Sequence, residues 1–182
     1  MSYQSAIAKA WDTIDSFREH EKAEVSFLGD TYEVDLKNHT VLSLACNVPA
    51  KDHVVILLLH YLASFFQAPP AIVGEWVSFK ELGGESYYPA FRKRAIEPLV
   101  RKYGSNPAGF LQAAARLGGR AVSGADAGAV IEVFKGVPVL INLWKGDDEF
   151  GPEANMLFDR GIQEVFCTED IAVLAGIVGS RL

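Results

Sequence analysis

The sequence has little cysteine and no surplus of positive charge, and each shortage excludes a class of protein. Its 182 residues include two cysteines, Cys46 and Cys167, too few for a disulfide scaffold or for the four ligands of an iron–sulfur cluster. The net charge of −6 argues against nucleic-acid binding. Because the cysteines stand far apart in the sequence, we expect two reduced, buried side chains and no metal site.

Long apolar runs are also missing. The most apolar stretch, Val54 to Phe66, is interrupted by His60 and Ser64, and a helix of that length spans only about 20 Å, too little to cross a bilayer. The first 20 residues mix acidic and basic side chains, unlike a signal peptide. We therefore expect a cytoplasmic protein with no membrane interaction.

What is present suffices to build a folded core. Hydrophobic residues make up 49% and charged residues 22% of the chain, as in ordinary globular proteins. The length fits one domain, and no linker or internal repeat divides it. We therefore predict a single domain over residues 1–182.

Hydrophobic spacing predicts the elements of the N-terminal part. Ile7, Trp11, Ile14 and Phe17 recur at helical spacing and predict an amphipathic helix over residues 2–20. Alternating apolar residues then predict a meander of three short strands. The strands are expected at 25–27, 32–36 and 41–44, with turns at Gly29-Asp30 (type II′) and Asn38-His39.

A central helix is expected next. Pro49 suits the first helical position and Asp52 the positive end of a helix that runs to Gln67 and is apolar nearly all round. Pro69-Pro70 ends it. Residues 71–86 resemble a loop around an apolar island at 76–79.

The C-terminal part mixes helices with a second set of strands. We expect a helix from Tyr88 that kinks or breaks at Pro98, a helix from Asn106 to Gly118, and a glycine-rich loop at 118–128. Two strands flank Lys135-Gly136, although the first could instead be a short helix capped by Asp126. The remaining expected elements are an acidic loop at 146–153, a strand at 156–158, and a final helix capped by Thr168, Glu169 and Asp170.

This order predicts an α+β fold. An antiparallel sheet, built from the N-terminal meander and the later hairpin, is packed with about five helices. The elements do not alternate strictly between strand and helix, which argues against a doubly wound parallel sheet.

The motifs of the common cofactor and metal sites are absent. The chain has no GxxxxGK[ST], no GxGxxG after a strand, no HExxH and no CxxC, so we expect no cofactor. His53 and His60 are two helical turns apart, about 10 Å, which is too far for one metal. His60 reads as a core histidine with one hydrogen-bonded nitrogen.

The acidic loop is the first candidate for chemistry. Asp147 and Glu149 follow the strand that ends at Trp144, and crowded carboxylates attract a cation or hold one member protonated as an acid. In the alternative, Asp147 accepts backbone N–H groups and only fixes the turn.

Two further patches carry alternatives of their own. The aromatic stretches 75–79 and 87–91, beside glycines, line a pocket for a planar ligand or form a satellite core under a long loop. The basic residues of 92–102 bind an anionic ligand or an acidic partner protein, or are simply a solvated helix face.

Several motifs, taken in order along nearly the whole chain, resemble one family. They are LLLHYL at 57–62, GEWVSF at 74–79, YPAF at 88–91, WKGDDEF at 144–150 and LFD at 157–159. The family is the domain of unknown function 3786, found in anaerobic bacteria and archaea. Some of its members carry an extra iron–sulfur module like that of corrinoid proteins, for which this chain lacks the cysteines.

The resemblance points to a set of candidate ligand-binding residues but to no activity. The set comprises His60, Glu75, Trp76, Tyr88, Asp126, Asp147, Glu149 and Asp159. We expect a cytoplasmic domain that binds a small molecule or acts as an accessory protein without catalysis. The alternatives are an enzyme that uses Asp147 and Glu149 as acid/base or metal ligands, and a protein-interaction module that uses the basic helix 92–102.

Overall fold

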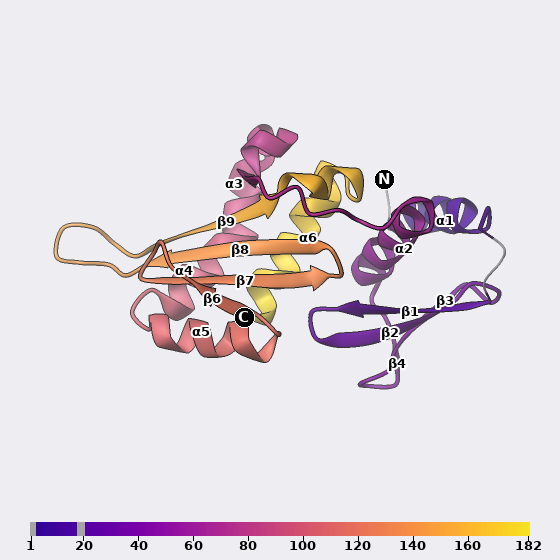
Figure 1. The fold of residues 1–182 in the computed structure, drawn as a ribbon, viewed down its shortest axis with the longest axis horizontal. Helices are drawn as coiled ribbons and strands as arrows, with labels where there is room; N and C mark the ends of the chain where they lie inside the picture. The colour runs from indigo at the N-terminus through magenta and orange to yellow at the C-terminus, as the bar shows by residue number, and fades with distance from the viewer. Residues whose placement is uncertain (1–2, 18–20) are drawn as a thin grey trace.

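The computed structural model describes residues 3–17 and 21–182. In this part of the chain, a four-stranded and a five-stranded antiparallel sheet each carry helices and form two adjoining lobes (Figure 1). The predicted α+β class is confirmed. The meander and the later hairpin, however, lie in separate sheets rather than one, because residues 68–75 carry the chain from the first lobe to the second.

The N-terminal lobe is the predicted helix and meander with an added strand. Its elements are α1 (Tyr3–Ile14), β1 (Lys22–Phe27), β2 (Asp30–Asp35), β3 (Thr40–Ser43), β4 (Val48–Pro49) and α2 (Asp52–Gln67). The first helix ends at Ile14, before a turn, rather than at residue 20, and residues 2 and 18–20 of the predicted helix lie outside the described residues. Pro49 lies in β4 rather than in the helix, which begins at Asp52.

The first hairpin turn differs from the expected one. Phe27 pairs with Asp30, so the turn residues are Leu28 (φ 48°) and Gly29 (φ 78°). Two positive φ angles make a type I′ turn, whereas Gly29-Asp30 predicted type II′. Leu28 tolerates this conformation because its side chain is buried and its N–H donates to the carbonyl of Val133 in the other lobe, at 3.1 Å.

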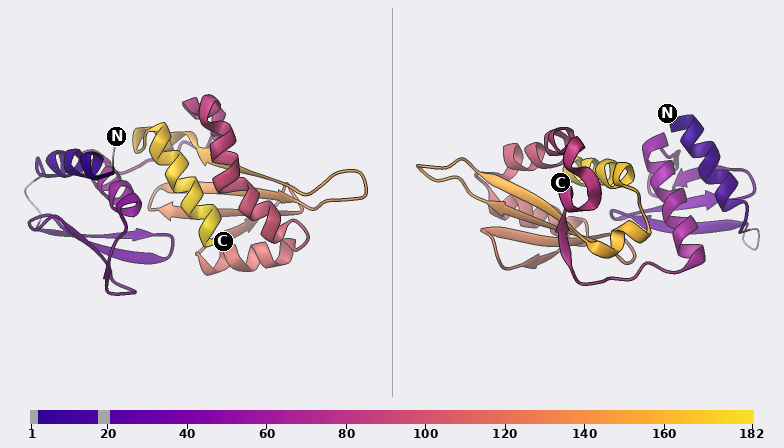
Figure 2. Two further views of the ribbon diagram at one scale, coloured as in Figure 1. Left: turned by 180° about the vertical axis from the view of Figure 1, so that it is seen from behind. Right: turned by 90° about the horizontal axis from the view of Figure 1, so that it is seen from above.

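The C-terminal lobe holds the second sheet, in the order β5-β9-β8-β7-β6. Its strands are β5 (Trp76–Ser78), β6 (Arg120–Val122), β7 (Ala127–Phe134), β8 (Val137–Trp144) and β9 (Glu153–Asp159). Its helical elements are η1 (Lys80–Gly84), η2 (Glu85–Tyr87), α3 (Tyr88–Phe91), η3 (Arg92–Ile96), α4 (Glu97–Tyr103), α5 (Pro107–Arg116), η4 (Arg160–Glu164) and α6 (Thr168–Arg181). Helix α6 lies beside the α3–α4 run (Figure 2).

Four details of this lobe correct the expectations. Residues 76–78 and 120–122 are strands rather than loop: the first pairs with β9, far along the chain, and the second forms a hairpin with β7, which follows it directly. Residue 126 caps no helix, since β7 begins at Ala127. The break expected at Pro98 is a π-helical stretch at Arg92–Ile96, one turn earlier, where the helix adjusts to the missing N–H of the proline.

Helix α2 is the apolar helix that the sequence predicts. Leu57, Leu58 and Leu59 are fully buried. The helix packs against α1 on one side and contacts α6 and β1 on others. Its length and burial confirm it as a core element rather than a membrane span; no helix among the described residues is long and apolar enough to cross a bilayer.

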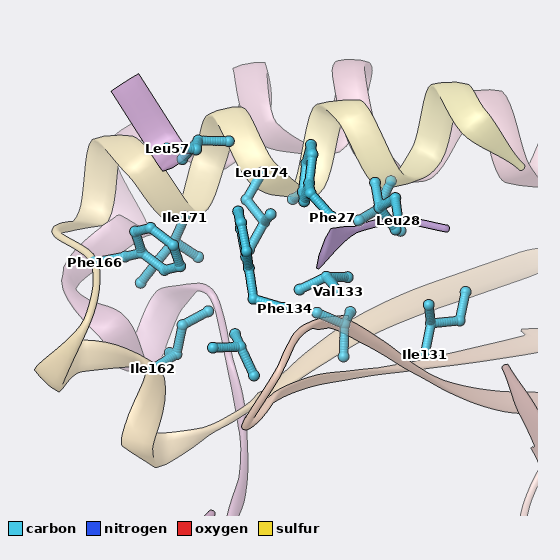
Figure 3. Close-up of a cluster of buried hydrophobic side chains, with 14 of the residues drawn as sticks. Phe27, Leu28, Leu57, Ile131, Val133, Phe134, Ile162, Phe166, Ile171 and Leu174 are labelled. Carbon is cyan, nitrogen blue, oxygen red and sulfur yellow. The ribbon is translucent and has the colours of Figure 1, made fainter. Parts of the chain in front are cut away.

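The two lobes share a hydrophobic junction. Phe134, at the end of β7, stacks between Phe27 of β1 and Tyr61 of α2, with 4.6 Å between ring centroids on each side. Leu174 of α6 lies beside Phe134, and Ile171 of the same helix lies beside Phe166; both are buried (Figure 3). The Tyr61 hydroxyl also donates to the carbonyl of Lys135, at 3.0 Å. The junction supports our proposal that both lobes belong to one folding unit.

Candidate functional site

A cleft of about 520 Å³ lies between the lobes. We call it the interlobe cleft. Its walls come from α2, from the connecting segment 68–73 and from the turn after β9. Its lining residues are His60, Ala63, Ser64, Gln67, Ala68, Pro69, Pro70, Ala71, Val73, Gly161, Glu164 and Val165.

His60 is held in place on one wall of this cleft. Its Nδ1 lies 2.8 Å from Oδ2 of Asp170, whose side chain is 9% exposed against 33% for the histidine. An ionised carboxylate only accepts hydrogen bonds, so Nδ1 carries the proton. In the neutral ring Nε2 is therefore an acceptor, and it has no hydrogen-bond partner within residues 3–17 and 21–182. The expected single hydrogen-bonded nitrogen is present, but His60 is half-buried rather than in the core.

Cys167 lies next to this pair and caps α6. Its backbone N–H donates to Oδ2 of Asp170 at 3.3 Å, and its Sγ lies 3.2 Å from the same oxygen. Although the residue as a whole is exposed, partial desolvation of its sulfur, with the neighbouring carboxylates, raises the pKa of the Cys167 thiol to about 11. The group is therefore a neutral thiol near pH 7 and a poor nucleophile, although it is next to a histidine–aspartate pair.

Both cysteines correct the expectation of buried side chains. Cys46 and Cys167 are free and exposed. Cys46 follows β3 in the turn before β4, and Cys167 precedes a helix, so each sits where the chain turns at the surface.

The raised pKa makes a measurable difference to labelling. In a Cys46→Ser variant at pH 8, we expect iodoacetamide to alkylate Cys167 of the native protein about tenfold more slowly than Cys167 of the urea-unfolded protein. The native protein has a smaller fraction of thiolate, and this outweighs the higher nucleophilicity of a thiolate whose pKa is raised. Mass spectrometry of quenched time points measures both rates. Equal rates would show that the folded environment leaves this thiol unprotected.

Asp159 fixes another wall of the cleft. It is 2% exposed and ends β9. Its carboxylate accepts backbone N–H bonds from Val73 (2.9 Å), Gly74 (2.6 Å) and Gly161 (2.9 Å). Val73 and Gly161 line the cleft. Asp159 therefore positions the cleft wall through backbone contacts and does not itself line the cleft.

Glu75 and Trp76 lie beside Asp159, outside the cleft lining. The guanidinium of Arg160 donates a hydrogen bond to each carboxylate oxygen of Glu75, at 2.6 and 2.8 Å. Hydrogen bonding from Arg160 lowers the pKa of the Glu75 carboxyl. Trp76 pairs with Asp159 across β5 and β9 and is 36% exposed. The connecting segment is thus attached to β9 by both side-chain and backbone contacts.

The acidic candidates are at the opposite end of β9. Asp147 Oδ1 accepts the backbone N–H groups of Glu149 (2.9 Å) and Phe150 (2.7 Å), and these bonds lower the pKa of the Asp147 carboxyl. Asp126 accepts the N–H of Lys145 at 2.7 Å. These are contacts of residues that fix turns, and Glu149 is exposed nearby.

The family can now be assigned. Residues 12–181 match the family model described as Domain of unknown function (DUF3786). The chain belongs to this family. No curated protein matches the chain, and no solved structure does. The resemblance drawn from the motifs is therefore confirmed, and the match covers the interlobe cleft and the acidic turn alike.

In this DUF3786 chain Tyr88 and the basic residues also lie outside the interlobe cleft. Tyr88 starts α3, half-buried, with its ring 4.5 Å from the Lys80 ammonium and 5.8 Å from Phe91. The basic residues of 92–102 are exposed. Among the described residues, no group of three or more His, Cys, Asp or Glu side chains is placed to hold a metal ion.

The structure therefore gathers some of the DUF3786 candidates and separates others. His60 and Asp159 contribute to one cleft, with Glu75 and Trp76 beside it. Tyr88, Asp126, Asp147 and Glu149 are away from it. Sequence reasoning missed Asp170 as the partner of His60, because it expected only a helix cap there. The two residues are 110 positions apart, and no local pattern signals such a contact.

Proposed function

We propose that the interlobe cleft binds a small, mainly apolar molecule that carries an N–H or O–H donor. The observation that carries this proposal is the His60–Asp170 pair on the cleft wall. The pair fixes the tautomer and leaves Nε2 as an oriented acceptor. A buried aspartate that orients a half-exposed histidine is a common arrangement in binding and catalytic sites.

The size and lining of the cleft support a small ligand. Its volume of about 520 Å³ lies within the range of small-molecule sites. Alanine, proline and valine side chains supply most of the wall, and the polar groups are few. Two consecutive prolines restrict the backbone of the connecting segment, so the cleft is largely formed before binding.

The polar groups of the lining favour a donor rather than an anion. Besides His60, the polar residues that line the cleft are Ser64, Gln67 and Glu164, of which only Glu164 carries a carboxylate. A carboxylate attracts hydrogen-bond donors and amines and repels other anions. The ligand class is therefore an alcohol, amine or amide with a compact apolar body.

The test uses probes of similar shape and different polarity. Benzyl alcohol, benzylamine, benzoate and toluene are titrated while the imidazole signals of His60 are followed by NMR. We expect the alcohol and amine to shift these signals saturably and benzoate to do so least. His60→Gln should weaken binding of the alcohol by about three- to tenfold, the loss of one hydrogen bond.

His53→Gln is the matched control, because His53 lies on the same helix but outside the cleft lining. It should leave probe affinity unchanged. The proposal fails if none of the four probes perturbs His60 or its cleft neighbours up to the solubility limit, or if both glutamine variants bind alike.

The acid/base or metal-binding role of Asp147 and Glu149 has no comparable support. Asp147 uses one oxygen to hold two backbone N–H groups, and the pair does not line the interlobe cleft. Protein interaction through 92–102 is the second candidate function. One observation favours it: Lys93 and Arg94 line a hollow together with residues of α6.

A further inference from the structure

The loop between β8 and β9 projects beyond the helices at the end of the molecule farthest from the N-terminal lobe (Figure 1). We call residues 145–152 the acidic tip. At this tip Phe150 is 71% exposed, and the carboxylates of Asp148 and Glu149 are next to it in sequence. An exposed phenyl ring among charges loses the apolar burial that a side chain of its size gains elsewhere.

The acidic tip is an ordered turn. The N–H of Asp147 donates to the carbonyl of Phe150 at 2.9 Å, and Asp147 Oδ1 accepts two N–H groups in return. At its base, the backbone N–H of Lys145 donates to the carboxylate of Asp126. Pro152 packs so closely against Gly104 that a Cβ at that glycine would lie only 2.6 Å from the proline ring. The turn thus presents Phe150 in a preorganised position, which lowers the entropy cost of docking.

A complementary surface lies on the same chain. A hollow of about 410 Å³, which we call the α6 groove, is floored by apolar groups of Pro98, Val173, Gly176 and Ile177 and bordered by Lys93 and Arg94. A second hollow adjoins it through Arg94 and Val173 and contains the acidic residue Glu169. The lining of the α6 groove itself combines apolar residues with the two cationic side chains.

We propose that the acidic tip of one copy docks into the α6 groove of a second copy. Phe150 lies on the apolar floor, and Asp148 and Glu149 face Lys93 and Arg94. The charges are opposite, and the hollow is large enough for a phenyl ring. This inference is independent of the proposed ligand-binding cleft, which uses a different surface.

The contact is small and joins two different patches. Docking of one loop buries less area than a standard interface, so the association is weak and concentration-dependent. Because tip and groove are different surfaces, two copies joined by one contact keep one free tip and one free groove between them, unless they exchange tips. Added salt weakens the contact by screening the rim charges.

Sedimentation analysis of the full chain over about 10 µM to 1 mM, a range that reports weak association, is the first test. We expect the average mass to rise above the 19.9 kDa of one copy. Phe150→Ser should weaken association about tenfold or more, from lost apolar burial. Val48→Ser, which removes another exposed apolar side chain at 50% exposure, should leave it unchanged.

Mixing two defective variants tests the assignment of the two surfaces. Phe150→Ser keeps only the groove, and the exposed pair Lys93→Glu with Arg94→Glu keeps only the tip. Each alone should remain monomeric, and the mixture should form a species of twice 19.9 kDa. Asp148→Lys with Glu149→Lys should restore binding to the glutamate groove.

A single species of 19.9 kDa for the unmodified chain at every concentration would overturn the proposal. Association that survives Phe150→Ser, or a mixture that stays monomeric while the unmodified chain associates, would also overturn it. Circular dichroism checks that each variant is folded. We expect all of them to fold, because these substitutions are at exposed positions.

Discussion

Replacing Phe134 with alanine is expected to lower the free energy of unfolding by about 3–5 kcal/mol, the cost of a large cavity in a core. Phe134 is 1% exposed and stacks on Phe27 and Tyr61 at 4.6 Å each, so its removal leaves two rings from the other lobe without their partner. Phe166, 5.6 Å away, also loses contact. Urea denaturation followed by circular dichroism measures the loss.

Phe150→Ala is the control for Phe134→Ala. Its ring is 71% exposed, and the substitution should change stability by less than about 0.5 kcal/mol. A cost below about 1 kcal/mol for Phe134→Ala would show that the junction contributes little.

The same junction allows a test of the single-domain proposal. Trp11 belongs to the N-terminal lobe, while Trp76 and Trp144 belong to the other. With Trp76 and Trp144 changed to phenylalanine, fluorescence reports the N-terminal lobe alone. For one cooperative unit, the fluorescence and circular dichroism transitions coincide. Separate midpoints would divide the chain into two domains.

The local elements of this fold could be predicted from the sequence because short-range periodicity determines them. The stripe of Ile7, Trp11 and Ile14 lies on α1, and the apolar run at 54–66 lies in α2. Alternating residues in the N-terminal part form β1 to β3. In each case burial of one face selects the element that the spacing favours.

The non-local features could not be predicted from the same patterns. The division into two sheets depends on where residues 68–75 carry the chain. The hairpin at Leu28 adopts a turn that its sequence disfavours, because burial of Leu28 against the second lobe outweighs the local preference. A three-residue strand such as β5 exists because β9 pairs with it.

The candidate site shows a similar division. His60 and Asp159 were selected from the sequence and contribute to one cleft. An aspartate that binds a ligand and one that holds backbone N–H groups have the same local sequence signature. The difference between Asp159, at a cleft wall, and Asp147, at a projecting turn, arises from contacts that are distant in sequence.

Asp159→Ala is the second substitution for which we expect a large cost, about 3 kcal/mol or more, because three charge-assisted hydrogen bonds disappear together. Asp159 is 2% exposed, and its carboxylate holds N–H groups from both the connecting segment and the turn after β9. Water re-solvates Val73 and Gly74, which are exposed, but reaches the buried N–H of Gly161 poorly. Thermal and urea unfolding measure the effect.

Two substitutions separate this role from that of an ordinary turn aspartate. Asp159→Asn keeps one acceptor oxygen and should retain part of the lost stability. Asp126→Ala removes an exposed carboxylate with a single backbone partner, Lys145, and should cost about 1 kcal/mol or less. Equal costs for the two alanine variants would refute the special position of Asp159. Since Asp159 anchors Val73 at the cleft wall, Asp159→Ala should also weaken benzyl alcohol binding at His60, whereas Asp126→Ala should not, because Asp126 is at the other end of the sheet.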